Sequence, residues 1–162
     1  MIEAVRKRFH QDTIALALIT LAAYLTYGLE RRLARDNAIY YYSAKQLVLG
    51  VPPLVSFFDV KTPLASFFSA VGVALAPLTD LHELVVVRAL FIPIGLFTIL
   101  ATQRLAKDIW GNRWIAWIAG LSLLALEPLL YVTLAGPRPK VLAVFFAVTT
   151  LLGGVSLYLV EG

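Results

Sequence analysis

The feature that most constrains this chain is a series of long apolar runs that carry almost no charge. Four runs share this property: residues 13–29, 84–103, 114–135 and 141–160. Each is close to the length of a helix that crosses a hydrocarbon core of about 30 Å. Backbone groups in lipid must also find their hydrogen bonds within the helix itself. The sequence therefore predicts an all-α, multi-pass transmembrane helical bundle with about four spans.

The composition favours a membrane protein and excludes several other classes. Hydrophobic residues make up 60% of the chain and charged residues only 15%, whereas about a quarter of the residues in an average soluble protein are charged. The absence of cysteine excludes disulfides and thiolate metal sites. The basic residues are scattered between the runs, so nucleic-acid binding is not expected. We therefore treat residues 1–162 as a single transmembrane module, whose net charge of +4 suits contact with anionic lipid headgroups.

Basic residues indicate how the runs are oriented. Residues 6–8 are all basic and precede the first run, and a second basic loop lies between runs 84–103 and 114–135. By the positive-inside rule, both segments belong on the cytoplasmic side. This orientation places both termini in the cytoplasm and residues 30–83 in a long outer loop. The predicted location is the cell membrane, with the active loops extracytoplasmic.

Two segments leave alternatives open. Residues 63–78 are short for a span and contain Pro77, so they are expected to lie along the interface or to re-enter the bilayer. If they crossed instead, the second basic loop would be placed outside. The first run could also be a cleavable signal peptide, because a basic segment precedes it. A retained anchor fits its length better.

The outer loop contains a predicted interfacial helix over residues 37–49. Asp36 occupies the expected N-cap position, and Gly50 follows the last turn, as is common at helix C-termini. Tyr40 and Ala44 share one face of this amphipathic helix. Tyrosines are enriched at the membrane–water boundary, so the helix is expected to lie in the interface.

Residues 36–64 also present an ordered set of residue types. Asp36 is followed by Tyr40, then by alanine and leucine at helical spacing and by glycine. Proline, Asp59 and the motif Lys61-x-Pro-Leu come next, before an apolar run. This order resembles the first outer loop of the GT-C fold glycosyltransferases of family 39, which include protein mannosyltransferases and aminoarabinose transferases. More loosely, the resemblance extends through Arg88 and the second basic loop, and it corresponds to the N-terminal part of such enzymes.

The resemblance implies transfer of a sugar from a polyprenyl-phosphate carrier to an acceptor on the outer face. The residue matching Asp36 would act as general base or orient the acceptor, because a hydroxyl or amine is a weak nucleophile until its proton is drawn away. Cations would neutralise the leaving lipid phosphate. Lys61 is the first candidate for this role, followed by Arg138 and Lys140. The other candidate substrate-binding residues are Asp59, Tyr40 and Arg88. The implied partners are the polyprenyl-phosphate sugar donor, membrane lipids and a partner membrane chain.

The second outer loop departs from the family pattern. Family members usually carry an acidic residue there, whereas residues 136–140 read Gly-Pro-Arg-Pro-Lys. A cation cannot chelate a divalent metal together with Asp36, so neither a metal nor another cofactor is expected. The departure favours phosphate binding by this loop or, alternatively, a loss of activity. A non-catalytic membrane subunit or lipid-binding scaffold derived from the fold is therefore the second hypothesis, and a small transporter is the third.

Two charged residues lie inside the apolar runs. Arg88 is close to one end of its run, where a long side chain can extend to the interface. Glu127 lies well inside the run 114–135 and precedes Pro128, which cannot donate a backbone hydrogen bond and invites a kink. Glu127 is expected to pair with Arg88 or Arg138, or to face a hydrated cavity. Asp36, in turn, could serve only as a helix cap.

Overall fold

The part of the chain that the computed structural model describes consists of helices joined by turns and short loops, and it contains no strand. It comprises residues 2–29, 35–52, 63–134, 136 and 138–161. Its elements are α1 (Ile2–Tyr27), α2 (Arg35–Val48), α3 (Leu64–Leu75), the 3₁₀ turn η1 (Ala76–Leu78), α4 (Glu83–Trp110), α5 (Arg113–Ala125), α6 (Glu127–Leu134) and α7 (Pro139–Glu161). The predicted all-α class is confirmed.

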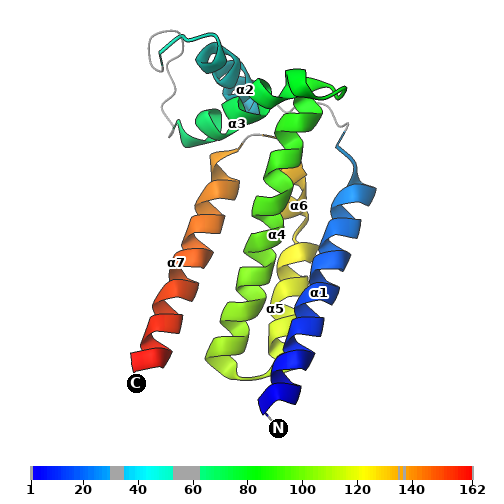
Figure 1. Cartoon of the computed structure of the whole chain (residues 1–162), viewed down its shortest axis with the longest axis vertical. Coiled ribbons are helices and arrows are strands. Elements are labelled where there is room, and N and C mark those ends of the chain that lie inside the picture. The colour runs from blue at the N-terminus through cyan, green and yellow to red at the C-terminus, as the bar shows by residue number, and fades with distance from the viewer. Residues whose placement is uncertain (1, 30–34, 53–62, 135, 137, 162) are drawn as a thin grey trace.

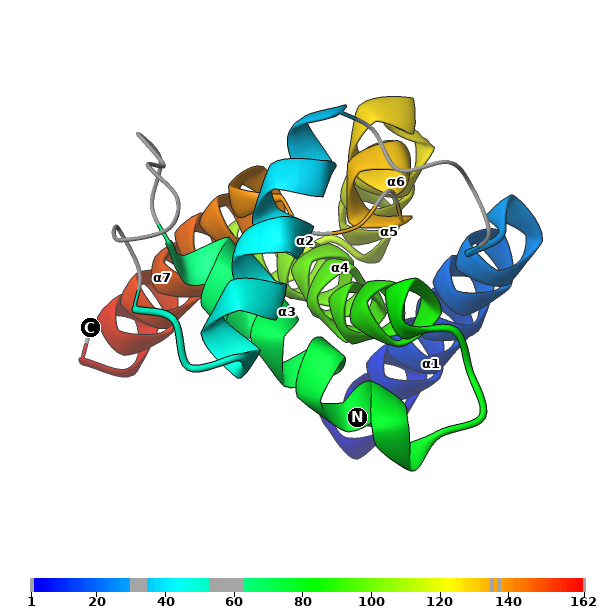
Figure 2. The same ribbon diagram turned by 90° about the horizontal axis from the view of Figure 1, so that it is seen from above.

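The long helices form a bundle that is covered at one end. Helices α1, α4, α5 with α6, and α7 run along the long axis, and α4 lies between the others (Figure 1). Helices α2 and α3 pack on each other and lie across the N-terminal end of α4 (Figures 1 and 2). Both chain termini lie at the opposite end. Residues 63–78, which were predicted to be interfacial or re-entrant, thus form α3 and η1 at the covered end.

Two helices are long and apolar enough to cross a membrane, by length and composition. They are α4 and the segment Pro139–Leu159 of α7, with mean hydropathies of 2.4 and 2.0. Only 11% of the most apolar stretch of α7 is buried in the protein. Large apolar surfaces of this kind mark contact with lipid or with another protein. Leu64–Leu78 and Arg113–Ala125 are shorter apolar helices, so the number of four spans stays a prediction.

The predicted kink near Pro128 is present as a full break between two helices. Helix α5 ends at Ala125, Leu126 has an extended backbone with ψ of 97°, and α6 begins at Glu127. Pro128 lacks an N–H, and its ring would clash with the carbonyl four residues earlier in a continuous helix. In the first turn of a new helix it is tolerated, which explains where α6 begins.

The start of α2 differs from the prediction, whereas its end agrees with it. The helix begins at Arg35, so Asp36 lies within the first turn and the predicted N-cap position is wrong. A carboxylate in the first turn still interacts favourably with the helix dipole. At the other end Gly50 has a φ of +78°, its N–H bonds to Leu47, and the N–H of Val51 bonds to Gln46. This pair of bonds is a Schellman motif, and it confirms the predicted terminator.

A shared apolar core joins α2 and α3, the two helices that cover the end of the bundle, to the long helices. Tyr40 and Ala44 of α2 belong to one buried cluster with Phe91 of α4 and with Val141 and Leu142 of α7. A second cluster, around Leu16, Tyr24, Ile99 and Leu134, joins α1, α4 and α6.

Helix α3 approaches α4 closely at Gly72. A Cβ atom at this position would lie 2.8 Å from the Cα atom of Val87. Small residues allow such close backbone contact between helices. The covering helices are therefore packed against the bundle.

Candidate functional site

The predicted site residues fall at the covered end of the bundle wherever the structure describes them. Asp36 lies in the first turn of α2, but its side chain is outside the described part of the structure, as are Asp59 and Lys61. The roles predicted for these three residues therefore stay predictions.

Arg138 joins the two predicted outer loops. Its Nε atom donates a hydrogen bond of 2.6 Å to Oδ1 of Asn37, which lies 101 residues away in the sequence. Asn37 is buried and directly follows Asp36 in α2. Lys140 is exposed in the first turn of α7. The cationic loop and the start of α2 are thus brought together at one place.

Tyr40 is a core residue. Its side chain is 3% exposed and packs within the apolar cluster that α2 shares with α4 and α7. On the opposite face of the same helix, Ile39 and Tyr42 are each 52% exposed. The burial of Tyr40 explains why an aromatic residue stands at this position, and its predicted contact with substrate stays a prediction.

Arg88 is the largest fully buried side chain of the described residues, with an exposed fraction of 1%. Its Nη1 atom donates a hydrogen bond to the backbone carbonyl of Leu29, and its Nε and Nη2 atoms have no partner among the described residues. The expected extension to the interface is therefore wrong. Burying a guanidinium without a partner costs free energy of folding. The unbonded Nε and Nη2 groups of Arg88 therefore require an explanation, such as a bound ligand.

Arg88 and Arg138 share an electrostatic property. Within the described part of the chain, both guanidinium groups bond to neutral oxygens, the Leu29 carbonyl and the Asn37 amide. Neither contact neutralises a positive charge. The expected pairing of Glu127 with one of these arginines involves a side chain outside the described residues.

An ion pair that the sequence pattern did not predict joins α2 to the start of α4. The Nζ atom of Lys45 lies 3.3 Å from Oε2 of Glu83 and 5.1 Å from the centre of the Tyr41 ring. Burial lowers the pKa of the Lys45 amine, but the interactions with Glu83 and Tyr41 raise it more, to above its ordinary 10.5. Burial and the neighbouring Glu83 also raise the pKa of Tyr41 above 10.0. The signal available in the sequence was the isolated Glu83 directly before an apolar run.

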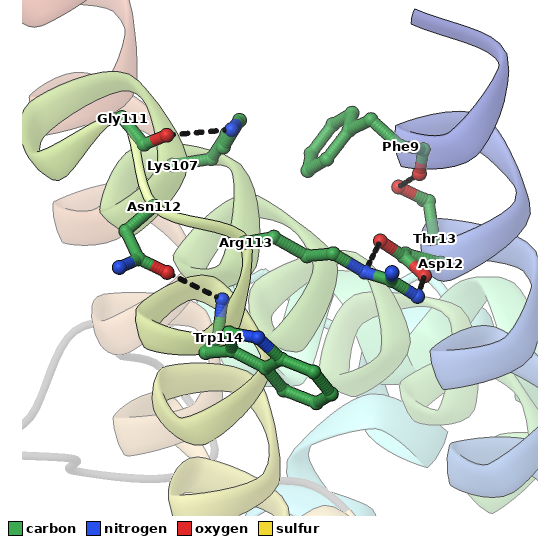
Figure 3. A network of polar contacts seen from close by, with 8 residues as sticks. All are labelled: Phe9, Asp12, Thr13, Lys107, Gly111, Asn112, Arg113 and Trp114. Atoms are coloured by element: carbon green, nitrogen blue, oxygen red, sulfur yellow. Dashed lines mark hydrogen bonds and ion pairs between the residues drawn. The ribbon is translucent and has the colours of Figure 1, made fainter. Parts of the chain in front are cut away.

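The other end of the bundle has a polar network of its own, shown in Figure 3. Nε and Nη2 of Arg113 lie 2.7 and 2.8 Å from the two carboxylate oxygens of Asp12, which is buried. The Lys107 amine bonds to the carbonyl of Gly111, and the Asn112 side chain accepts the N–H of Trp114 to cap α5. The Asp12–Arg113 pair was also missed, although Asp12 stands out as the charge directly before the first apolar run.

Potential metal ligands do not gather in the described residues. No group of three His, Asp or Glu side chains is placed to hold a metal ion there. His82 caps α4, because its Nδ1 atom accepts the N–H of Leu84 at 3.2 Å.

Comparison with family models, with curated proteins and with solved structures finds no match to this chain.

Proposed function

We propose that this chain is a membrane-embedded glycosyltransferase module of the GT-C type, which transfers a sugar from a polyprenyl-phosphate carrier to an acceptor on the extracytoplasmic face. The proposal rests on one observation: among the described residues, neither Arg88 nor Arg138 bonds to a group of negative charge. Both guanidinium groups lie at the covered end and, among the described residues, bond to neutral oxygens. Such groups are suited to a phosphate, which guanidinium binds with two parallel hydrogen bonds.

The proposed reaction uses one carboxylate and several cations. Asp36 takes the proton of the acceptor hydroxyl or amine as the acceptor oxygen or nitrogen forms its bond to the anomeric carbon. The bond between that carbon and the phosphate oxygen breaks, and the electron pair leaves with the polyprenyl phosphate. Arg138, Lys61 and Lys140 stabilise the charge that develops on this phosphate. The hydrogen bond between Arg138 and Asn37 supports this arrangement, because Asn37 is the neighbour of Asp36.

The proposed membrane placement uses four crossing segments. These are α1, α4, the broken pair α5–α6, and α7, with α2 and α3 at the outer interface. Lys107 and Arg113 flank the turn between α4 and α5, and the N-terminal basic residues 6–8 belong to the same end. The positive-inside rule assigns that end to the cytoplasm. The exposed Trp110 and Trp114 suit the membrane–water boundary there.

The proposed chemistry is tested with Asp36→Asn in membranes supplied with a polyprenyl-phosphate sugar. Loss of a general base slows a reaction by about 10² to 10⁴-fold, and we expect a decrease of that size. The matched control is Asp80→Asn, which removes the same charge from an exposed position between η1 and α4. Transfer that is unchanged in the Asp36 variant would show that this residue is not the base.

The proposed topology is tested separately by cysteine labelling. The chain has no cysteine, so in each single-cysteine variant the maleimide can label only the introduced residue. Ser56→Cys should react with an impermeant maleimide from outside the cell, and Ile109→Cys only after the membrane is opened. Ile109 is suitable because it is 50% exposed and does not cap a helix. Labelling of Ile109→Cys from outside would reject the orientation.

A second candidate function is a non-catalytic membrane subunit that retains the same architecture. Two of the candidate residues have structural contacts that support it: Tyr40 is buried in the core, and Arg138 is bonded to Asn37. A subunit of this kind would bind the carrier lipid without transferring its sugar. Binding of a polyprenyl phosphate that is unaffected by Asp36→Asn, together with no transfer by any partner complex, would favour the subunit.

A further inference from the structure

A large groove opens between three helices, in the half of the bundle that holds the chain termini. Its volume is about 980 Å³, which is at the upper end of the range of about 300–1,000 Å³ for ligand sites. Helices α1, α4 and α7 each contribute to its walls. Its mostly apolar lining includes Phe9, Phe97, Leu100, Ala101, Phe145 and Leu152. The groove is separate from the covered end where Arg88 and Arg138 lie.

One side of the groove is polar and includes a guanidinium that is paired with a carboxylate at Nε only. Arg104 and His10 line it together with the apolar residues. The Arg104 side chain is 55% exposed, and its guanidinium lies 5.5 Å from the centre of the Phe9 ring. Its Nε atom bonds to Asp108 at 2.8 Å. No hydrogen bond of its two Nη groups occurs within the described residues, so both can face an anion.

We propose that this groove binds an acyl chain of an anionic phospholipid, with the lipid phosphate held by Arg104. The inference rests on the membrane placement proposed above and is independent of sugar transfer. Apolar walls favour a hydrocarbon chain, since each buried methylene contributes to binding. A cation beside those walls selects an anionic headgroup over a zwitterionic one. Anionic lipids are enriched in the cytoplasmic leaflet, where the proposed orientation places this end of the bundle.

The test uses the purified full chain in phosphatidylcholine vesicles that contain a phosphatidylglycerol with a photoreactive acyl chain. Cross-links should map to groove residues such as Phe97 and Phe145. An equal amount of photoreactive phosphatidylcholine should label these positions much less. Since one basic residue near an anionic surface contributes about a fivefold change in binding, Arg104→Gln should lower the labelling by about fivefold. Lys107→Gln removes the same charge from the same helix outside the groove, so it measures the general attraction to the anionic surface, and it should lower the labelling less than Arg104→Gln.

A second pair of variants tests the groove itself. Thr149→Trp places a large ring among the lining residues and should abolish labelling in the groove. Leu151→Trp adds the same ring to α7 at a position that is 59% exposed and outside the lining, so labelling should persist. This control also shows whether α7 tolerates a tryptophan.

Three results would overturn the proposal. Equal labelling by both lipids would mean ordinary annular contact, and labelling that persists in Thr149→Trp would place the lipid elsewhere. Absence of lipid adducts at both Phe97 and Phe145 in the unsubstituted chain would mean that a lipid does not occupy the groove. Sugar transfer by Arg104→Gln should equal that of the unsubstituted chain, and the labelling of Ile109→Cys reports on topology. Failure of the lipid site is thereby distinguished from failure of the proposed function.

Discussion

The two ends of the bundle treat their arginines differently. At the end with the α4–α5 turn, Arg113 meets both carboxylate oxygens of the buried Asp12. At the covered end, Arg88 and Arg138 meet neutral oxygens within the described residues. Neutralised cations stabilise a fold, whereas cations without a counter-charge retain an affinity for anions. The difference is consistent with a structural role for the first end and with the phosphate binding proposed for the second.

Arg88 provides the strongest test of this comparison. Arg88→Met replaces a buried, incompletely bonded guanidinium by an apolar side chain, a kind of change that is often neutral or stabilising for the fold. If Arg88 holds the carrier phosphate, sugar transfer should decrease by about 10²-fold or more, as when one electrostatic donor is removed. Transfer in membranes and thermal unfolding in detergent measure the two effects.

The matched control for this variant is Gln103→Met. Gln103 is also buried in α4, its side-chain amide has no partner among the described residues, and it lies toward the opposite end. Its transfer rate should not change. An equal loss of transfer in both variants would mean that α4 packing, and not phosphate binding, is the cause.

Arg113→Gln should give the opposite result, a loss of stability without a specific loss of transfer. The Asp12 side chain is only 6% exposed and would be left without its partner. Leaving a buried polar group unpaired costs about 1–3 kcal/mol, which lowers the melting temperature by about 2–4 °C per kcal/mol in a chain of this size. Adding Asp12→Asn should restore most of the loss. Arg138→Gln, which leaves only a neutral amide behind, should be less destabilising than Arg113→Gln.

Two glycine-to-alanine variants test how closely α3 packs against α4. Gly72→Ala should destabilise the fold by about 1–3 kcal/mol, since its Cβ would meet the backbone of Val87, which cannot move alone. At Gly120, in the contact between α5 and α1, the new Cβ would meet the end of the Leu16 side chain at 2.5 Å. That side chain can rotate, so Gly120→Ala should cost less. Equal losses in thermal unfolding would indicate that the α3–α4 contact is looser than described.

The smallest expected effect concerns the ion pair between Lys45 and Glu83. The pKa of Lys45 is raised in the folded chain, so the pair contributes its stability fully below pH 10.5 and loses it as the pH rises through the higher folded pKa. Tyr41, whose pKa is also raised, acts in the same direction. Partly exposed pairs contribute less than about 1 kcal/mol. Unfolding measured from pH 8 to 11 should therefore show a shallow decline that Lys45→Met reduces.

The features that sequence predicted correctly depend on local chemistry. The glycine that ends α2 and the break near Pro128 follow from what Gly50 and Pro128 permit in their own backbone. The helical class follows from runs of apolar residues. Each of these signals is contained within a few neighbouring residues, so no knowledge of the tertiary arrangement is needed.

The features that sequence did not predict depend on which helix faces meet. The burial of Tyr40 requires α2 to pack near α4 and α7, Arg88 bonds to Leu29 at a distance of 59 positions, and the Arg138–Asn37 bond joins residues 101 positions apart. The Asp12–Arg113 pair has the same separation. The burial of these charged side chains comes from contacts between helices, which the order of residues in the sequence does not reveal. The proposed phosphate binding depends on two of these groups, Arg88 and Arg138.

The break at Leu126 also has a consequence for hydration. Helix α5 has 13 residues and spans about 20 Å at 1.5 Å per residue, which is less than the hydrocarbon thickness of about 30 Å. With Trp114 at the cytoplasmic boundary, the end of α5 would lie about 10 Å below the outer boundary. The break is partly closed there, because the N–H of Leu126 bonds to the Leu123 carbonyl and the N–H of Leu129 to the Leu126 carbonyl. Backbone groups at that depth that lack a helical partner require water or protein, so in the proposed orientation the break at Leu126 would face water or protein and not the lipid chains.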